Sequence, residues 1–334
     1  MKRRDLPGFA RSPALMFLIA LLALGLAVTG PALAAKPDNP GGGNGGGNGG
    51  GKGGGKNKTP AVRFEGAGDS IMRAYNADCT GNTGLFDFLC YGGGDQNENS
   101  FLDGSSSNVL SIVDRYVALD SRATGGKSAS ASGSEMTDPA RNNFQTQAAA
   151  IVSAATQPVK VVVELGGNDL CNRSSDADLY PDAQWQAAVD GGLQLLVDGL
   201  PDGSTVYLSS VPRVQDLRGV GIEKQNSTSR VNCEAFWSSF DVCPIATSSD
   251  LYFAALGERQ KAYNEILAGR AGHFNSLATT TGVEVVTEYQ GEEIVSVGTY
   301  RFAPTDINGG DCFHPSISGQ NKVSEVLWSN NPFK

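Results

Sequence analysis

Histidine is scarce in this sequence: the 334 residues include only His273 and His314. None of the six cysteines belongs to a C-x-x-C pair, and no cysteine–histidine cluster has the spacing of zinc ligands. Structural zinc sites need four such ligands at short, regular intervals. We therefore expect no zinc site. If a histidine has a chemical role in this protein, it is either His273 or His314.

Long apolar runs are equally scarce, and the longest is ALMFLIALLALGLAV, which covers residues 14–28. It follows a basic N-terminus and precedes the small residues around Ala34 and Ala35. The run is shorter than the ~20 residues that a membrane-spanning helix needs. This arrangement is typical of a signal peptide. We expect residues 1–35 to be removed on export to the periplasm or the extracellular medium, leaving no stable membrane anchor.

Residues 36–58 consist almost entirely of glycine, asparagine and lysine. A glycine-rich tract of this kind behaves as a flexible linker. It is not expected to bind phosphate, because no strand precedes it and no helix follows it. Residues 59–334 are long enough to form one sizeable domain with its own core.

Positive charge is in short supply once the predicted signal peptide is set aside. Residues 1–35 contain four of the 26 basic and one of the 35 acidic residues, so the remainder carries 22 basic and 34 acidic residues, a net charge of −12. An acidic chain argues against nucleic acid as a partner. The charge does not exclude a lipid that meets only a local apolar pocket.

All six cysteines lie in the part predicted to be exported, where an even number favours three disulfides. Fifteen pairings are possible in principle. The shortest spacings favour Cys79–Cys90 and Cys233–Cys243, which leaves Cys171 to pair with Cys312. Other pairings, such as Cys171 with Cys233, remain open.

Apolar periodicity predicts strands that alternate with helices. The expected strands are 61–68, 158–165, 204–212 and 283–289, and the expected helices are 105–120, 137–156, 182–200, 249–282 (one or two helices) and 316–328. Such alternation indicates parallel βαβ units, and hence an α/β fold with helices on both faces of the sheet. The polar segment 213–249 is expected to be a disulfide-tied loop or a small lid.

Three of these predicted segments end in, or lead to, clusters of polar residues. They are Gly68-Asp69-Ser70, Gly166-Gly167-Asn168-Asp169 and the D-x-x-H-P segment from Asp311 to Pro315. Open α/β sheets bind ligands at the carboxyl ends of their strands. A serine there becomes nucleophilic when a histidine takes its proton and an aspartate orients that histidine. Together the three clusters suggest acyl transfer.

The assignment of the base depends on the neighbours of the two histidines. His314 follows Asp311 by three residues, whereas His273 lies in a predicted helix with no acid nearby. We therefore predict Ser70, Asp311 and His314 as the catalytic residues. The oxyanion hole would use the backbone N–H of Ser70, the amide of Asn168 and a glycine N–H. Gly133 is preferred for the last role over Gly125 and Gly126.

The ordered blocks GDS, GGND and D-x-x-H-P resemble the SGNH hydrolase superfamily, also called GDSL esterases and lipases, over residues 61–329. Ser70, Gly133, Asn168 and His314 match the four residues that name it, although Ile71 stands where the family has leucine. The resemblance implies a three-layer α/β/α, flavodoxin-like domain and no metal or organic cofactor. The strings GGNDLC and DCFHPS are particularly similar to the phospholipase B-like branch.

The expected function is that of a secreted esterase or lipase that hydrolyses carboxylic esters, possible substrates being phospholipids and other acyl esters. A carbohydrate or cell-wall O-acetylesterase is the alternative within the same chemistry. A secreted binding module or adhesin that merely keeps the fold is an alternative of another class. If Cys171 pairs with Cys312, the bond would also join the segments that carry Asn168 and Asp311.

Overall fold

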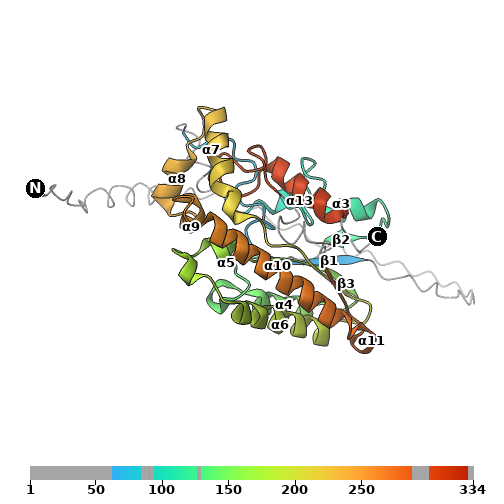
Figure 1. Ribbon diagram of the computed structural model, residues 1–334. Coiled ribbons are helices and arrows are strands. Elements are labelled where there is room, and N and C mark those ends of the chain that lie inside the picture. Colours follow the sequence, from blue (N-terminus) through green and yellow to red (C-terminus); the bar gives the residue numbers. More distant parts are fainter. Residues whose placement is uncertain (1–61, 84–89, 91–93, 126–128, 288–300, 330–334) are drawn as a thin grey trace, which may run out of the picture. The chain divides into compact units, whose positions relative to one another are not determined.

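The computed structural model describes residues 62–83, 90, 94–125, 129–287 and 301–329. These residues belong to one compact unit, Lys58–Lys334. The predicted signal peptide (1–35) and linker (36–58) lie outside the described residues, so both remain predictions. Figure 1 shows the arrangement of the described helices and strands.

A five-stranded sheet forms the centre of the unit, with strand order β2-β1-β3-β4-β5 and every neighbouring pair parallel. Its strands are β1 (Arg63–Gly68), β2 (Thr124–Gly125), β3 (Val159–Glu164), β4 (Thr205–Leu208) and β5 (Glu284–Thr287). The sequence predicts four of these strands and misses the two-residue edge strand β2. Because all strands run the same way, their carboxyl ends meet along one edge of the sheet.

Helices cover both faces of this sheet, as predicted for a three-layer α/β/α fold (Figure 1). The α-helices are α3 (Ile112–Val117), α4 (Phe144–Ala154), α5 (Gly167–Cys171), α6 (Asp182–Gly199), α7 (Leu217–Ser227), α8 (Cys233–Phe240), α9 (Pro244–Thr247), α10 (Phe253–Asn275), α11 (Ala278–Thr281) and α13 (Ile317–Ser329). Short 3-10 helices are η1 (Asn97–Asn99), η2 (Pro139–Arg141), η3 (Asp176–Asp178) and η4 (Val214–Asp216).

Strand residues alternate between two apolar clusters, one on each face of the sheet. The side chains of Val161 and Val163 pack with α4, α6 and α10, whereas Val162 packs with α3 and α13. Because β3 is buried on both of its faces, its sequence is a nearly continuous apolar run. Gly192 allows close packing on the first face, since a Cβ there would come within 2.1 Å of the ring of Phe144.

Local capping sets where two of the predicted helices begin. The first is expected over 105–120 but starts at Ile112, because Ser111 and Asp114 form a reciprocal capping box. The other is interrupted after η2, where Asn142 adopts a left-handed conformation with φ +49°. Asn143 then caps α4. The expected single helix over 137–156 is therefore two elements.

The segment 213–249 is helical, which corrects the expectation of a loop. It contains η4, α7, α8 and α9. Of the expected disulfides only Cys79–Cys90 agrees with the structure, and the other two expectations are wrong. The remaining cysteines pair as Cys171–Cys243 and Cys233–Cys312, with Cα separations of 4.3 and 5.5 Å.

The wrong pairing has a simple geometric reason. Cys233 is the first residue of α8, an eight-residue helix, and Cys243 follows its end. A helix of eight residues rises about 12 Å, whereas the Cα atoms of a disulfide lie roughly 4.4–6.8 Å apart. The helix therefore holds apart the two cysteines that are closest in sequence, and each pairs with a partner outside the segment.

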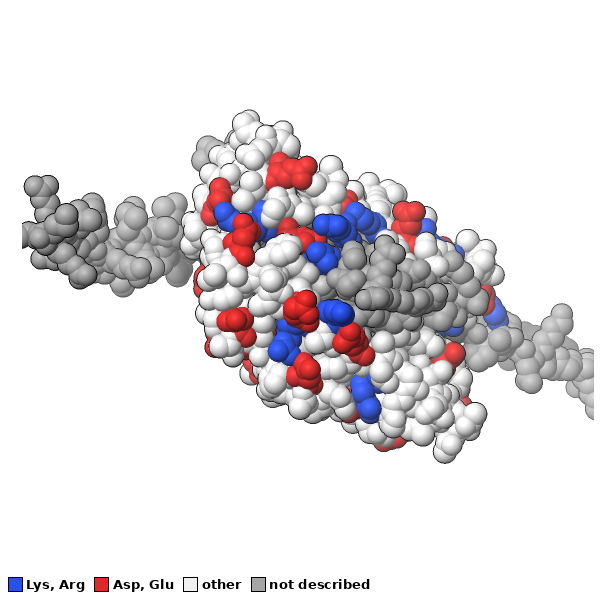
Figure 2. Space-filling model, in the orientation of Figure 1, with Lys and Arg blue, Asp and Glu red and all other residues white. Residues whose placement is uncertain are grey.

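None of the described helices is both long and apolar enough to cross a membrane. On the face shown in Figure 2, Lys and Arg side chains of the described residues lie among Asp and Glu side chains. They do not gather there into a basic patch of the kind that binds a polyanion.

The buried carboxyl group of Glu164 makes the stability of the fold depend on pH. Neither of its oxygens has a hydrogen-bond partner among the described residues. Burial raises the pKa of Glu164 well above its ordinary value, and neighbouring Asp69 raises that pKa further. Above the ordinary pKa the unfolded chain releases a proton that the folded chain retains, so stability falls as pH rises.

We therefore expect Glu164→Met to flatten the pH dependence of stability. Between pH 5 and 7 the wild type should lose up to about 1.4 kcal/mol more per pH unit than the variant. Urea denaturation at several pH values measures this difference. Glu258→Met, at an exposed position, is the matched control. Equal slopes for wild type and Glu164→Met would contradict the assignment of a neutral buried acid.

Candidate active site

Ser70 lies in the turn that follows β1, at the carboxyl edge of the sheet. Two backbone hydrogen bonds hold the turn: the N–H of Arg73 donates to the carbonyl of Asp69, and the N–H of Tyr75 donates to that of Ser70. Ser70 is 5% exposed. The serine is thus a buried residue on a short, well-bonded turn.

His314 reaches Ser70 across a sequence separation of 244 residues. Its Nε2 lies 2.8 Å from Ser70 Oγ, and its Nδ1 lies 2.9 Å from Asp311 Oδ2. The three side chains therefore form one continuous chain of hydrogen bonds. Asn308 helps fix the loop, because its backbone N–H donates to the carbonyl of His314 at 2.8 Å.

The carboxylate of Asp311 is buried but well supplied with donors. Its Oδ1 accepts the backbone N–H groups of Phe313 and His314, both at 2.9 Å, and its Oδ2 also accepts the amide of Asn76 at 3.1 Å. Burial by itself would raise the pKa of Asp311. Charge and hydrogen bonds from His314, with the backbone bonds, outweigh burial and lower that pKa. Asp311 therefore stays ionised at neutral pH.

Asn168 lies in α5, directly after the sharp turn at Gly166, where φ is +119°. Its amide nitrogen donates to Asp69 Oδ2 at 3.2 Å and to the carbonyl of Ser134 at 2.9 Å. Burial raises the pKa of Asp69 to about 6, although a backbone hydrogen bond from Ile71 opposes that rise. Both protons of the Asn168 amide are engaged, and the contact with Asp69 is the longer one.

Gly133 lies on the loop between β2 and η2, with φ +82°. Only glycine adopts such a conformation freely. The buried carboxylate of Asp169 fixes the following stretch by accepting the N–H of Met136 at 2.7 Å and the hydroxyl of Thr137 at 2.7 Å. The fourth residue of the GGND block therefore orders the loop that carries Gly133.

Two backbone N–H groups near the serine hydroxyl are unpaired among the described residues. The N–H groups of Ser70 and Gly133 make no hydrogen bond to any residue that the structure describes. Both residues line the same open cleft as Asn168 and His314. Unpaired N–H groups beside a serine hydroxyl are suited to bind a developing negative charge.

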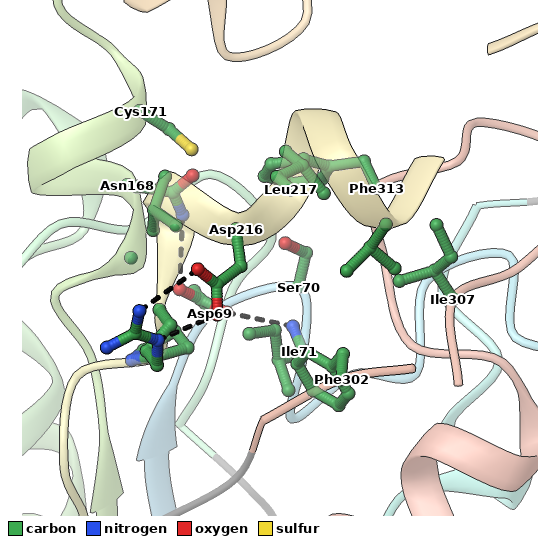
Figure 3. Close-up of a pocket in the computed structure, with 15 residues that line it drawn as sticks. Asp69, Ser70, Ile71, Asn168, Cys171, Asp216, Leu217, Phe302, Ile307 and Phe313 are labelled. Atoms are coloured by element: carbon green, nitrogen blue, oxygen red, sulfur yellow. Dashed lines mark hydrogen bonds and ion pairs between the residues drawn. The ribbon is translucent and has the colours of Figure 1, made fainter. Parts of the chain in front are cut away.

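Two cavities meet at Ser70 and Asn168. The narrower one, about 50 Å³, has a mostly apolar wall. Figure 3 shows Ser70 lying between Asn168 on one side and Phe313 and Ile307 on the other. The apolar residues that line this narrower cavity are Ile71, Pro212, Val214, Leu217, Val220, Phe302, Ile307 and Phe313. The wider one, about 380 Å³, contains His314 and is bordered by Tyr75, Asn172, Phe236 and Phe240.

The predicted site residues are accordingly brought together: Ser70, Asp311 and His314 form one hydrogen-bond chain, and Asn168 and Gly133 line the cleft beside it. His273 is exposed on α10 and lines neither of the two cavities. Within the described part of the chain, no group of three or more His, Cys, Asp or Glu residues could hold a metal ion.

Sequence reasoning missed the residues that support this constellation. Asn76 bonds Asp311, Asp69 bonds Asn168, and Asn308 holds the His314 loop. Asp69 belongs to the GDS block, so its position was a usable signal. Asn76 and Asn308 lie in polar turn segments, where an asparagine normally indicates only a turn.

The comparison with protein families identifies the chain. Residues 66–327 match the model described as GDSL-like lipase/acylhydrolase, and the chain belongs to that family. Together with the α/β fold, this defines the protein as a hydrolase of ester bonds. Membership of the phospholipase B-like branch rests on the sequence resemblance alone. A comparison with curated proteins finds no match.

Solved structures with a similar chain course include two esterases. An active-site mutant of a family two carbohydrate esterase from Clostridium thermocellum has 14% identity and a TM-score of 0.42 over 80% of this chain, which spans 62% of that protein. An extracellular lipase from Streptomyces rimosus has 15% identity and a TM-score of 0.41, over 81% of this chain and all of the lipase. Neither similarity bears on the substrate of this chain.

The backbone at Gly133 generates a prediction. A Cβ there would meet nothing within 4 Å, so Gly133→Ala should lose stability through its positive φ alone, by roughly 1–2 kcal/mol. Gly219→Ala is the matched control, because Gly219 lies in α7 with equally open surroundings. The free energy of unfolding of this control should rise by about 0.5–1 kcal/mol. Chemical denaturation measures the free energy of unfolding of both variants. If Gly133→Ala is as stable as the wild type, the left-handed geometry of Gly133 is contradicted.

Proposed function

We propose that the protein is an exported serine hydrolase that cleaves carboxylic esters through a Ser70–His314–Asp311 triad and an acyl-enzyme. The observation that carries this proposal is the unbroken hydrogen-bond chain from Ser70 Oγ through both ring nitrogens of His314 to Asp311. Three disulfides support export, since such bonds persist in oxidising compartments. The predicted signal peptide is consistent with that location.

In the first half-reaction, Ser70 Oγ attacks the ester carbonyl while His314 Nε2 takes the hydroxyl proton. Asp311 accepts the Nδ1 proton in a hydrogen bond and stabilises the imidazolium. His314 then gives its proton to the leaving alcohol as the tetrahedral intermediate collapses. In the second half-reaction, water attacks the acyl-Ser70 ester by the same route, and the carboxylic acid leaves.

The negative charge of each tetrahedral intermediate needs donors at the carbonyl oxygen. We assign the backbone N–H groups of Ser70 and Gly133 to this role, because both are unpaired among the described residues. Asn168 is the third donor. Its longer bond, to Asp69 Oδ2 at 3.2 Å, is the one that the oxyanion would compete for. Asp69 would thus orient the amide until substrate arrives.

The position of His314 supports an assignment of the two halves of the substrate to the two cavities. The general acid must lie next to the leaving oxygen, and His314 lines the wide cleft but not the narrow cavity. The alcohol half therefore occupies the wide cleft. The acyl half enters the narrow apolar cavity, which suits an alkyl chain. The apolar lining of that cavity is the observation that supports a lipid ester, a phospholipid being one example, over an O-acetyl ester of a polysaccharide.

Replacing the nucleophile tests the reaction class. We expect Ser70→Ala to lower kcat/KM for model esters by roughly 10⁴-fold or more, because the residual rate would come only from binding and oxyanion donors. The variant should also fail to react with a fluorophosphonate. His273→Ala, which alters the histidine outside the triad, should retain both activities. Near-normal turnover by Ser70→Ala would refute the proposed mechanism.

Narrowing the apolar cavity tests the acyl assignment. Val220 lines the narrow cavity, and Val220→Phe should fill part of it with a ring. We expect kcat/KM for octanoyl esters to fall about tenfold or more, since roughly two buried methylenes account for that loss. Acetyl esters should be affected little. Val117→Phe, at an exposed site, is the control, and an unchanged acyl-chain preference in Val220→Phe would contradict the assignment.

A further inference from the structure

Helix α8 is covalently attached at both ends to the two halves of the proposed catalytic site. Its first residue, Cys233, is bonded to Cys312, which lies between Asp311 and His314. Just after its last turn, Cys243 is bonded to Cys171, which lies three residues beyond Asn168 in α5. The helix thus spans from the acid–base loop to the helix that carries the proposed oxyanion donor.

A buried hydrogen bond adds to the covalent link at the acid–base loop. Trp237, in the middle of α8, is 3% exposed, and its indole N–H donates to the backbone carbonyl of Asp311 at 3.1 Å. The ring packs in a small apolar cluster with Cys233, Cys312 and Ile307. A Cβ on Gly221 would come within 2.2 Å of the same ring, so α7 also lies directly against it.

Trp237 contacts the backbone of Asp311, and it is not one of the residues proposed to react. The carbonyl of Asp311 belongs to the residue whose carboxylate orients His314. In a buried site that carbonyl would lose its indole donor if Trp237 were replaced, and the loop would shift toward another partner. A small displacement of a catalytic group lowers the rate more than it lowers binding.

We propose that α8 is a strut that sets the separation of the oxyanion donor from the acid–base pair, and that Trp237 is its positioning residue. The proposal rests on the proposed function of Ser70, Asn168, Asp311 and His314. Trp237 acts through the backbone of Asp311, and the bond between Cys171 and Cys243 acts through α5 on Asn168.

Trp237→Phe tests the first contact, because it keeps an aromatic ring but removes the donor. We expect kcat to fall about tenfold with KM nearly unchanged, since a misplaced acid affects the transition state. Trp185→Phe is the matched control: Trp185 is fully buried, and its indole N–H has no partner among the described residues. The control carries the same loss of ring volume and should retain kcat.

A double-mutant cycle separates positioning from general packing. In an Asp311→Asn background, Trp237→Phe should cost almost nothing further, because the acid that it positions is already lost. Likewise the pair Cys171→Ala and Cys243→Ala should lower kcat about tenfold in the wild type but much less in an Asn168→Ala background. Losses that persist in full in these backgrounds would overturn the proposal.

Proton NMR gives a readout besides activity. The Nδ1 proton of His314 lies in the 2.9 Å contact with Asp311, and it can be assigned readily because the chain has only two histidines. Trp237→Phe should shift this resonance, whereas Trp185→Phe should not. An unmoved resonance with unchanged kcat would overturn the role of Trp237. Full activity of Ser70→Ala would instead overturn the proposed function itself.

Discussion

The buried carboxylate of Asp311 is the constraint on which the geometry of the site depends. A carboxylate removed from water is costly unless hydrogen bonds replace its hydration. Here the donors come from Asn76, from the backbone of Phe313 and from His314. Satisfying the acid therefore forces a segment near β1 and the loop before α13 to meet. Ser70 belongs to the same segment as Asn76, which places its hydroxyl within reach of the imidazole.

The parallel sheet supplies the remaining alignment. Because β1 and β3 are adjacent and in register from Arg63 to Gly68, the turns that follow them begin side by side. One turn carries Asp69 and Ser70, and the other leads into α5, which carries Asn168, so the contact between Asp69 and Asn168 follows from strand order. The polar residues of the site thus share a single edge although they are dispersed across almost the whole domain.

The sequence predicts the fold class and the main site residues, because both depend on short local signals. The apolar run of β3 marks a strand buried on both faces, and the scarcity of histidine directs attention to His314. Disulfide partners were less predictable: spacing favours Cys233 with Cys243, but a helix between them reverses the outcome. The hydrogen bond from the Trp237 indole to Asp311 joins residues 74 positions apart, and no local sequence pattern predicts it.

The crossed disulfides have a consequence for how the chain matures. In an extended chain, the short loop from Cys233 to Cys243 closes at the smallest entropic cost, so these thiols encounter each other first. The native partners lie 72 and 79 residues apart. Oxidation that outruns the winding of α8 would therefore trap a non-native bond. Thiol–disulfide exchange must then undo it, which makes the yield of correctly bonded enzyme depend on an isomerase or on slow oxidation.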